Sequence, residues 1–327
     1  MDEITKQPVE SWETDFDHTH PDYAANAHNI WDDLRGRCPV AHTDRFGGVW
    51  LPTRHEDVAA IAANEHGWYT SQGVVVSEIR PEIDAPIGGA PPITSDPPFH
   101  APARKLLLEP FAPRKIKALE PFARDFCHTL LDGALAKNQE QGWFDAAVDY
   151  AQDIPVRVIA KMLGLPPEDG DIFRNFIHLI IENPVERDLA EEDTIEWYLD
   201  QQIARHKADP KPPGEGDLID HLLNVEIFGE PLSPEHVRGT VILLLIAGID
   251  TTWSAIGSAI WHLAQNPGDL ARFRDEPEVR PFAVEEFLRA YAPVTMARIV
   301  AEDHELGGCD LKQGDWLLLP PGKSPWQ

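Results

Sequence analysis

The stretch SPEHVRGTVILLLIAGIDTTWSAIGSAIWHLAQNP, from Ser233 to Pro267, decides the fold of this chain. Ser233 is a favoured N-cap, Pro234 suits the first helical position, and Glu235 lies at the positive end of the helix dipole. No residue forces a stop before Pro267, so the stretch predicts one helix of roughly 30 residues, about 50 Å long. Residues 241–247 are apolar on every side, which is typical of a helix buried through the centre of a large domain.

A membrane-spanning helix is the alternative interpretation of this stretch. The apolar run is too short to cross a bilayer, and Asp250, Thr251 and Thr252 interrupt it. The chain does not open on a secretory signal or a spanning segment, so we expect a soluble, cytoplasmic protein.

Small and polar residues follow the apolar run. Ala247 and Thr251 lie one turn apart on one face, with Gly248 beside them, so a flat group could approach the backbone there. Thr251 can bond a carbonyl one turn back and Gly248 weakens the helix, so we expect a local distortion. Asp250 would be costly here without a partner or water, and a carboxylate beside a hydroxyl is typical of a proton-delivery pair. A polar pair satisfied within a core helix is the alternative.

The motif AGIDTT, residues 247–252, resembles the oxygen-activation motif on the long central helix of the cytochrome P-450 superfamily, the haem-thiolate monooxygenases. The resemblance implies a mainly α fold with a small β-sheet region, and heme b (haem) as the cofactor, lying against Ala247 and Gly248. It implies that Thr251 hydrogen-bonds the dioxygen held at the iron and that Asp250 relays protons to it. The implied reaction inserts one oxygen atom from dioxygen into a small apolar organic substrate, with electrons from a ferredoxin-type partner.

Three further blocks match the family in the expected order. His100 and Arg104 are i,i+4, so they can grip one anion from one helix face, and they resemble the residues that hold haem propionates. Glu286 and Arg289 match the family's Glu-x-x-Arg, a structural ion pair. Arg298 begins a predicted strand and takes the place of an arginine that contacts a propionate in many bacterial members.

Each of these blocks has a plainer alternative. His100 or Arg104 alone could be an ordinary exposed residue. Glu285 with Arg289 could form a surface i,i+4 pair, worth about 0.3–0.5 kcal/mol. The order of the blocks along the chain favours the family resemblance over these alternatives.

The charge of the chain limits its partners. With 55 Asp and Glu against 28 Lys and Arg, the formal net charge is −27, which argues against nucleic acid and anionic membranes. Arg114, Lys115 and Lys117 nevertheless form a basic cluster. Such a cluster is usually a solvated face, but its contrast with the acidic remainder favours docking of an acidic electron donor.

The remaining sequence predicts the domain organisation. Residues 1–22 are acidic and aperiodic and should form a loose arm, and residues 23–327 should form one cytochrome P-450-like domain. A capping box over residues 53–56 predicts a helix through Ala63. The long loop 67–98 and the helices between 173 and 206 are expected to line a largely apolar pocket facing Ala247 and Thr251.

The resemblance stops at residues 319–320. The Phe-x-x-Gly-x-x-x-Cys-x-Gly loop that supplies the iron's thiolate ligand is not present, so we expect a chain truncated before it and a fold incomplete at the C-terminus. Cys38, Cys127 and Cys309 lie at unrelated spacings outside any such loop, so no metal ligand is assigned. A catalytically inactive, haem-free fragment, or a helical binding protein of the same descent, is therefore the alternative function. The chain alone is not expected to give a thiolate-ligated haem enzyme.

Overall fold

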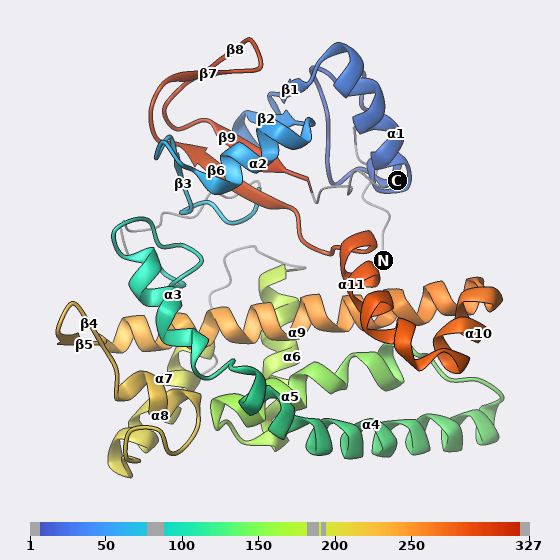
Figure 1. Ribbon diagram of the computed structural model, residues 1–327, viewed down its shortest axis with the longest axis vertical. Coiled ribbons are helices and arrows are strands. Elements are labelled where there is room, and N and C mark those ends of the chain that lie inside the picture. The colour runs from blue at the N-terminus through green and yellow to red at the C-terminus, as the bar shows by residue number, and fades with distance from the viewer. Residues whose placement is uncertain (1–6, 77–87, 182–189, 191–193, 321–327) are drawn as a thin grey trace. The chain divides into compact units, whose positions relative to one another are not determined.

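A computed structural model describes residues 7–76, 88–181, 190 and 194–320. The chain divides into two compact units (Figure 1), and the single domain predicted for residues 23–327 stays a prediction. The sheet unit comprises Met1–Gly88, Ile93–Asp96 and Val294–Gln327, and the helical unit comprises Gly89–Pro92 and Pro97–Pro293.

The sheet unit is built on five short strands in the order β1-β2-β9-β6-β3. The strands are β1 Val40–Thr43, β2 Val49–Pro52, β3 Tyr69–Thr70, β6 Met296–Val300 and β9 Trp316–Leu319. β2 and β9 run parallel, and the other neighbours run antiparallel. The unit also contains α1 Pro21–Arg37, the 3₁₀ turn Arg45–Gly47, α2 His55–Ala63 and the hairpin of β7 His304–Leu306 and β8 Cys309–Leu311. Together with the helices of the other unit, these strands confirm the predicted mainly α fold with a small sheet.

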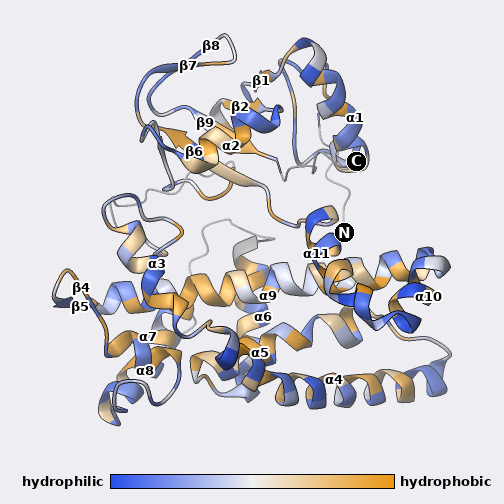
Figure 2. Ribbon diagram, in the orientation of Figure 1, coloured by the Kyte–Doolittle hydropathy of each residue, from blue (hydrophilic) through white to orange (hydrophobic). Residues whose placement is uncertain are grey.

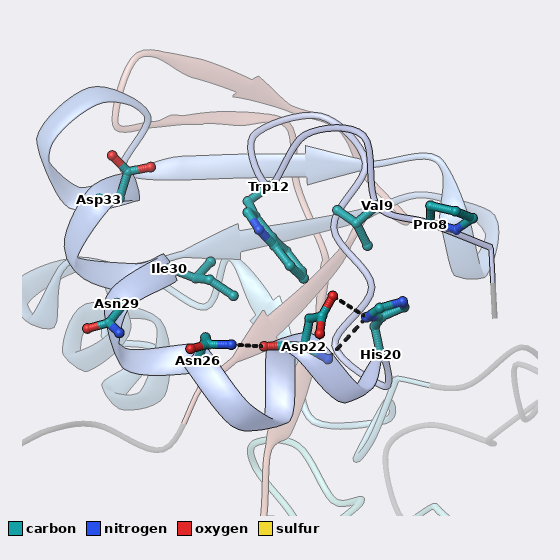
Figure 3. Close-up of a pocket in the computed structure, with 9 residues that line it drawn as sticks. All are labelled: Pro8, Val9, Trp12, His20, Asp22, Asn26, Asn29, Ile30 and Asp33. Carbon is teal, nitrogen blue, oxygen red and sulfur yellow. Dashed lines mark hydrogen bonds and ion pairs between the residues drawn. The ribbon is translucent and has the colours of Figure 1, made fainter. Parts of the chain in front are cut away.

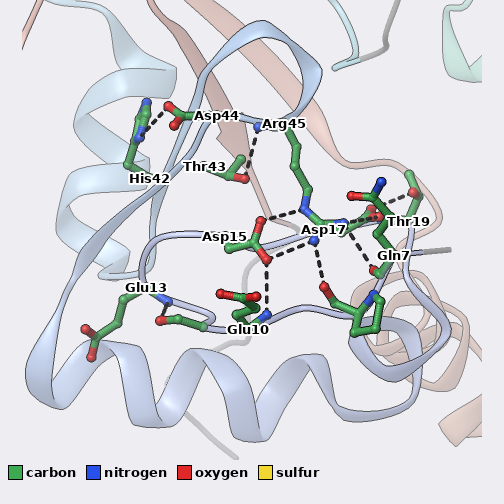
Figure 4. Close-up of polar contacts among 12 residues, drawn as sticks. Gln7, Glu10, Glu13, Asp15, Asp17, Thr19, His42, Thr43, Asp44 and Arg45 are labelled. Atoms are coloured by element: carbon green, nitrogen blue, oxygen red, sulfur yellow. Dashed lines mark hydrogen bonds and ion pairs between the residues drawn. The ribbon is translucent and has the colours of Figure 1, made fainter.

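The N-terminal segment differs from the loose arm that the sequence predicts. Arg45 donates from Nε and Nη2 to the two carboxylate oxygens of Asp15, each at 2.8 Å, and from Nη2 to the carbonyl of Pro8 at 2.9 Å (Figure 4). Phe16 is completely buried in the core of the sheet unit, and Asp15 forms a β-bridge with Thr43. One buried aromatic ring and one bidentate ion pair therefore fix a stretch whose composition suggested disorder.

The helix predicted from residues 53–56 forms, but the predicted capping box is wrong. The Thr53 hydroxyl donates to the carbonyl of Pro39 at 3.0 Å. Arg54 occupies the N-cap position, with no side-chain cap. The hydroxyl therefore fastens this stretch to the start of β1 and does not cap α2.

The helical unit contains nine α-helices among its described residues, with α9 at its centre (Figure 1). They are α3 His100–Leu108, α4 Pro113–Gln141, α5 Asp153–Leu163, α6 Gly170–Ile181, α7 Ile195–Ala208, α8 Leu218–Leu223, α9 Pro234–Gln265, α10 Pro267–Asp275 and α11 Arg280–Ala290. Short turns at Ala147–Ala151, Pro167–Asp169 and Pro277–Val279 and the small hairpin of β4 Glu226–Ile227 and β5 Glu230–Pro231 complete it. α9 contacts α5, α6, α7, α8, α10 and α11.

Helix α9 begins and ends where the sequence predicts. It has 32 residues, and the Ser233 hydroxyl accepts a hydrogen bond from the His236 backbone N–H at 3.2 Å. The middle of the helix is its most hydrophobic part (Figure 2). Its apolar side chains pack into the main core, with Val241, Leu245 and Ile249 fully buried. The buried residues end at Ile249, so only the first half of the helix is a core helix. The helix is uninterrupted, so the expected distortion does not break it.

Among the described residues, α9 is also the one helix long and apolar enough to cross a membrane. Only 33% of the residues in its most apolar 18-residue stretch are buried. Length and composition alone are weak evidence, because the core helix of a soluble protein has the same features.

The substrate-covering loop predicted over 67–98 contains the short strand β3, and its residues 77–87 lie outside the described part of the chain. Residues 182–189 and 191–193, between the two predicted lid helices, also lie outside it. The apolar pocket expected between these segments and α9 stays a prediction.

Candidate functional site

The predicted oxygen-activation motif lies just beyond the most buried part of α9. Thr251 Oγ1 donates a hydrogen bond to the backbone carbonyl of Ala247 at 2.6 Å, as the sequence analysis anticipated. The side chain of Ala247 is exposed, and Thr251 is half-buried. This turn of the helix therefore offers a small side chain and a hydroxyl on one face, open to an approaching group.

Gly248 lies on a different side of the same turn. A Cβ atom added to Gly248 would meet Cδ1 and Cγ1 of Ile159, each at 3.1 Å, so the missing side chain lets α5 approach α9 closely. The structure gives Gly248 this packing role, and its predicted contact with haem stays a prediction. Asp250 is half-buried and has an interaction partner. A partly buried carboxylate needs such a partner, because burial without one would be costly.

The predicted propionate-binding pair lies on α3. His100, at the first position of the helix, is half-buried, and Arg104, one turn later, is exposed. Among the described residues, neither side chain forms a hydrogen bond or an ion pair. Two basic side chains one turn apart are thus available to an anion.

Arg298, the third predicted propionate ligand, lies on β6 in the sheet unit. Its Nη1 donates to the carbonyl of Ala297 at 2.8 Å, and no carboxylate of the described residues forms an ion pair with it. Burial lowers the pKa of the guanidinium, and the charge of Asp96 offsets this only in part. The Asp96 carboxylate is itself held by Thr70 and by the backbone N–H of Ser71. A partly buried cation without a carboxylate partner is suited to a bound anion.

Glu286 and Arg289 form an ion pair within α11. Arg289 Nε donates to Glu286 Oε2 at 2.7 Å and Nη2 donates to Oε1 at 2.5 Å, so the contact is bidentate. The hydrogen bonds from Arg289 hold the pKa of Glu286 below its usual range. The Glu286 side chain is 56% exposed, so the pair lies at the surface of the described structure.

The basic cluster lies at the start of α4. Arg114 and Lys117 are exposed, whereas Lys115 is half-buried and its Nζ lies 2.7 Å from Glu109 Oε1. Lys105, also exposed, adds a further positive charge from α3. Two residues of the predicted cluster and this additional lysine are therefore free to meet an acidic surface.

The three cysteines are free thiols. The thiols of Cys38 and Cys309 both donate to the Val40 carbonyl, with Sγ to oxygen distances of 3.5 and 3.9 Å. Burial raises the pKa of Cys38, which disfavours the thiolate. Cys127 lies on α4. That none of them is an iron ligand stays a prediction.

A pocket of about 710 Å³ lies in the sheet unit, between the N-terminal segment and α1 (Figure 3). Its walls include Trp12, His20, Asp22 and Asn29. It contains none of the predicted site residues, and its polar groups are spread along an open groove.

Sequence reasoning missed two polar groups of the helical unit. His206, Asp217 and Asp220 come together where α7 leads into α8. Thr240 is 2% exposed on α9 and its hydroxyl has no hydrogen-bond partner among the described residues. Asp217 with Asp220 carries a capping-box signal, but nothing local indicates that a histidine eleven residues earlier joins it.

Comparison with known proteins shows the relationship directly. The family model described as "Cytochrome P450" matches residues 156–323, just over half of the chain. The chain is 30% identical to a putative cytochrome P450, YjiB, of Bacillus subtilis over 296 residues, covering 88% of this chain and 71% of the relative. It is 32% identical over 312 residues to a vitamin D(3) 25-hydroxylase of Pseudonocardia autotrophica, covering 94% of this chain and 73% of the relative.

Solved structures agree with this result. The structure of cytochrome P450 CYP109Q5 from Chondromyces apiculatus is similar with a TM-score of 0.79 and 28% identity, covering 94% of this chain and 76% of that one. The crystal structure of CYP109E1 from Bacillus megaterium, in complex with testosterone, has a TM-score of 0.74 and 28% identity, covering 90% and 75% of the two chains.

Proposed function

The chain belongs to the cytochrome P450 family of haem monooxygenases, and on that premise we propose that it inserts one oxygen atom of dioxygen into a small apolar substrate, using electrons from a ferredoxin-type protein. The observation that carries this proposal is the turn of α9 with Ala247 exposed and the Thr251 hydroxyl bonded to the Ala247 carbonyl.

The Thr251 hydroxyl is suited to hold a proton beside a reacting oxygen. With its hydrogen on the Ala247 carbonyl, Oγ1 keeps its lone pairs for a donor. Rotation about the Cβ–Oγ1 bond would turn the O–H away from the Ala247 carbonyl. We propose that Asp250, the residue before Thr251, supplies a new proton to the Thr251 hydroxyl after that hydroxyl has given one up.

The basic residues of the chain fit the carboxylates of a haem. The haem, when bound, supplies dioxygen activation and electron storage. Among the described residues, Arg298 is partly buried without a carboxylate partner, and His100 and Arg104, on one face of α3, form no hydrogen bond or ion pair with their side chains. Each would gain a charge-assisted hydrogen bond from a propionate. We propose heme b as the form bound.

The substrate class rests on the relatives and on the lid helices. One relative is named for vitamin D(3), and one structural neighbour was solved with testosterone, which are both largely apolar ring systems. In this chain, α6 and α7 contribute Phe173, Ile177 and Leu199 to the core beside α9. If the predicted pocket lies beside this apolar core, a largely apolar substrate is the class that we propose it accepts.

The electron donor and the location complete the proposal. Arg114, Lys117 and Lys105 form an exposed basic surface on an acidic protein, which suits an acidic donor of the ferredoxin type. We propose a cytoplasmic location, supported by the packing of the apolar face of α9 against α5.

Oxygen labelling tests the reaction. The chain would be fused to a family segment that carries the cysteine loop, loaded with haem and reduced under ¹⁸O₂ with a panel of apolar ring compounds, and the masses of the products would be measured by mass spectrometry. We expect one ¹⁸O atom per product. A second measurement, haem titration followed by absorbance, should show weaker binding for Arg298→Leu than for the wild type. Products labelled from water, or haem binding that is indifferent to Arg298, would contradict the proposal.

A further inference from the structure

One histidine and two aspartates meet at the connection between α7 and α8, in the helical unit. His206 lies in the last turn of α7, Asp217 is the N-cap of α8, and Asp220 is its third residue. One ligand atom from each of the three residues lies within 4.8 Å of the other two. The same residues line a pocket of about 340 Å³, together with Gln202 and Lys211.

Each of the three side chains is oriented by hydrogen bonds, and a metal ion would take the place of the proton between His206 Nε2 and Asp217 Oδ2. His206 Nδ1 lies 2.8 Å from the Gln202 carbonyl, to which it must donate, so Nε2 faces Asp217 Oδ2 at 3.0 Å. Asp217 Oδ1 accepts from the Asp220 backbone N–H at 3.0 Å, and Asp220 Oδ2 accepts from the Asp217 N–H at 3.1 Å. Metal ligands are commonly held by such outer hydrogen bonds, above all a histidine that donates to a backbone carbonyl.

The charges in the cluster do not balance. Asp220 is 3% exposed, and no cation of the described residues forms an ion pair with it. Of the two nearby cations, Lys211 lies 2.5 Å from Asp209 and acts on Asp217 and Asp220 only through its charge, and Arg205 donates to Gln202 Oε1 at 3.1 Å. Two carboxylates largely removed from water thus face one titratable imidazole, and a divalent cation beside a neutral imidazole would balance them.

Two glycines hold the carboxylates in place. Gly164 and Gly216 both have positive φ. A Cβ atom on Gly164 would lie 1.8 Å from Asp217 Oδ2, and one on Gly216 would lie 2.2 Å from Asp220 Oδ2. The backbone therefore closes over the carboxylates on these sides, and the pocket is their remaining approach.

We propose that His206, Asp217 and Asp220 bind one divalent transition-metal cation. One imidazole nitrogen and two carboxylate oxygens are a ligand set that suits zinc and its first-row neighbours, with water from the pocket completing the coordination. The ion would fasten the end of α7 to the start of α8. This site is separate from the proposed haem-binding residues and does not depend on the proposed monooxygenase activity.

Calorimetric titration of the full chain with ZnCl₂, in a buffer that does not chelate zinc, tests the site. We expect one zinc ion per chain, with affinity reduced at least tenfold in His206→Gln and in Asp217→Asn. Asparagine remains a good N-cap, so the second variant removes the charge and keeps the start of α8. His128→Gln, which changes an exposed histidine on α4, is the matched control and should bind zinc as the wild type does.

Thermal unfolding gives a second measurement on the same proteins. Zinc should raise the unfolding midpoint of the wild type and of His128→Gln, and should leave His206→Gln and Asp217→Asn unchanged. If either variant fails to fold, Asp220→Asn replaces it. Zinc that does not saturate one site on the wild type, or that binds His206→Gln with wild-type affinity, would overturn the proposal.

Discussion

Two threonines on α9 show how differently one residue type can be used. Thr240 and Thr251 are eleven residues apart, about three helical turns, so they lie on nearly the same face. The Thr251 hydroxyl bonds the carbonyl four residues earlier, whereas the Thr240 hydroxyl is buried with no partner among the described residues. From the local sequence, either hydroxyl could bond the backbone carbonyl four residues earlier. Only the packing around each one separates them.

Thr240→Val should stabilise the protein. Valine has nearly the shape of threonine and removes a buried hydroxyl that lacks a partner, so we expect a gain of about 1 kcal/mol in the free energy of unfolding. Urea denaturation measures it, with Thr252→Val, at an exposed position of the same helix, as the control that should change little. A loss of stability in Thr240→Val would show that the hydroxyl is bonded in solution.

Thr251→Ala should separate oxygen consumption from product formation. The variant loses the hydroxyl that we propose holds a proton at the reacting oxygen, so reduced oxygen should leave as hydrogen peroxide while haem binding stays unchanged. Alanine is a better helix former, so α9 should not be weakened. The ratio of peroxide to product is the measurement, and Thr252→Ala is the control. An unchanged ratio in Thr251→Ala would remove Thr251 from the proposed proton path.

At the scale of elements, glycines in α9 decide how closely other segments approach. A Cβ atom on Gly239 would lie 2.3 Å from the Gly89 carbonyl oxygen, whereas one on Gly257 would meet nothing within 4 Å. The sequence predicts the limits of α9 from Ser233 and Pro267, because caps are local signals. It cannot rank these glycines, since the segment that crosses Gly239 lies about 150 residues away in the chain.

Alanine substitutions at these two glycines should have opposite effects. Gly257→Ala should stabilise the protein by about 0.8 kcal/mol, which is the difference in helix propensity. Gly239→Ala should destabilise it by about 1–3 kcal/mol, because backbone must move to admit the methyl group. Urea denaturation of both variants measures the difference. Equal gains at both positions would mean that the segment at Gly89 does not pack on α9 in solution.

The ion pair of Arg45 with Asp15 makes the attachment of the N-terminal segment sensitive to acid. The hydrogen bonds from Arg45 lower the pKa of Asp15 from 3.8. A group with a lowered folded pKa stabilises above its unfolded pKa and loses that contribution as pH falls through the folded pKa. The contacts of Arg45 with Asp15 (Figure 4) should therefore contribute fully above about pH 4, and the segment should loosen as the pH falls below it.

Proteolysis of the N-terminal segment tests this attachment. Pepsin should cleave near residues 8–16 increasingly as the pH falls below 3.8, and Asp15→Asn should be cleaved faster than the wild type already at pH 5 with a protease active there. Asp44→Asn is the control, because the Asp44 side chain is fully exposed at the surface. Arg45→Met should cost about 2 kcal/mol of unfolding free energy, which is typical of hydrogen bonds between charged groups. Cleavage rates that are equal for Asp15→Asn and the wild type would contradict the assignment.

At the scale of the whole molecule, the sequence predicts the chemistry of the protein better than it predicts how the chain divides into the sheet unit and the helical unit. The order of motifs predicts the family, because each motif is a local pattern with a fixed place on its helix or strand. The two units depend on segments that join from distant parts of the chain. Strand β9, for example, pairs with β2 through Trp316 and Leu317, and no local pattern in the sequence indicates that pairing. The burial of Phe16 could not be predicted either, because a short acidic segment does not indicate that one of its rings fills the core of the sheet unit.

The overall charge makes the basic surface at α3 and α4 the place where electrostatics should act on an acidic donor. A net charge of −27 repels a ferredoxin-type protein on average, so association depends on the local field of Arg114, Lys117 and Lys105. Arg114→Glu should lower the association rate constant about tenfold at low salt, because it changes the local charge by two units. Stopped-flow reduction at several ionic strengths measures this rate.

The salt dependence distinguishes a docking surface from a general charge effect. The wild-type rate should fall as salt rises, since attraction between opposite charges is screened over about 8–10 Å at physiological ionic strength. In Arg114→Glu this fall should be weaker. Arg272→Glu makes the same change of charge on α10, which follows the C-terminal end of α9, and should keep the wild-type rate and salt slope. If both variants lose the same amount, the donor responds to net charge alone and docks elsewhere. A loss confined to Arg114→Glu would place the donor on the surface formed by α3 and α4.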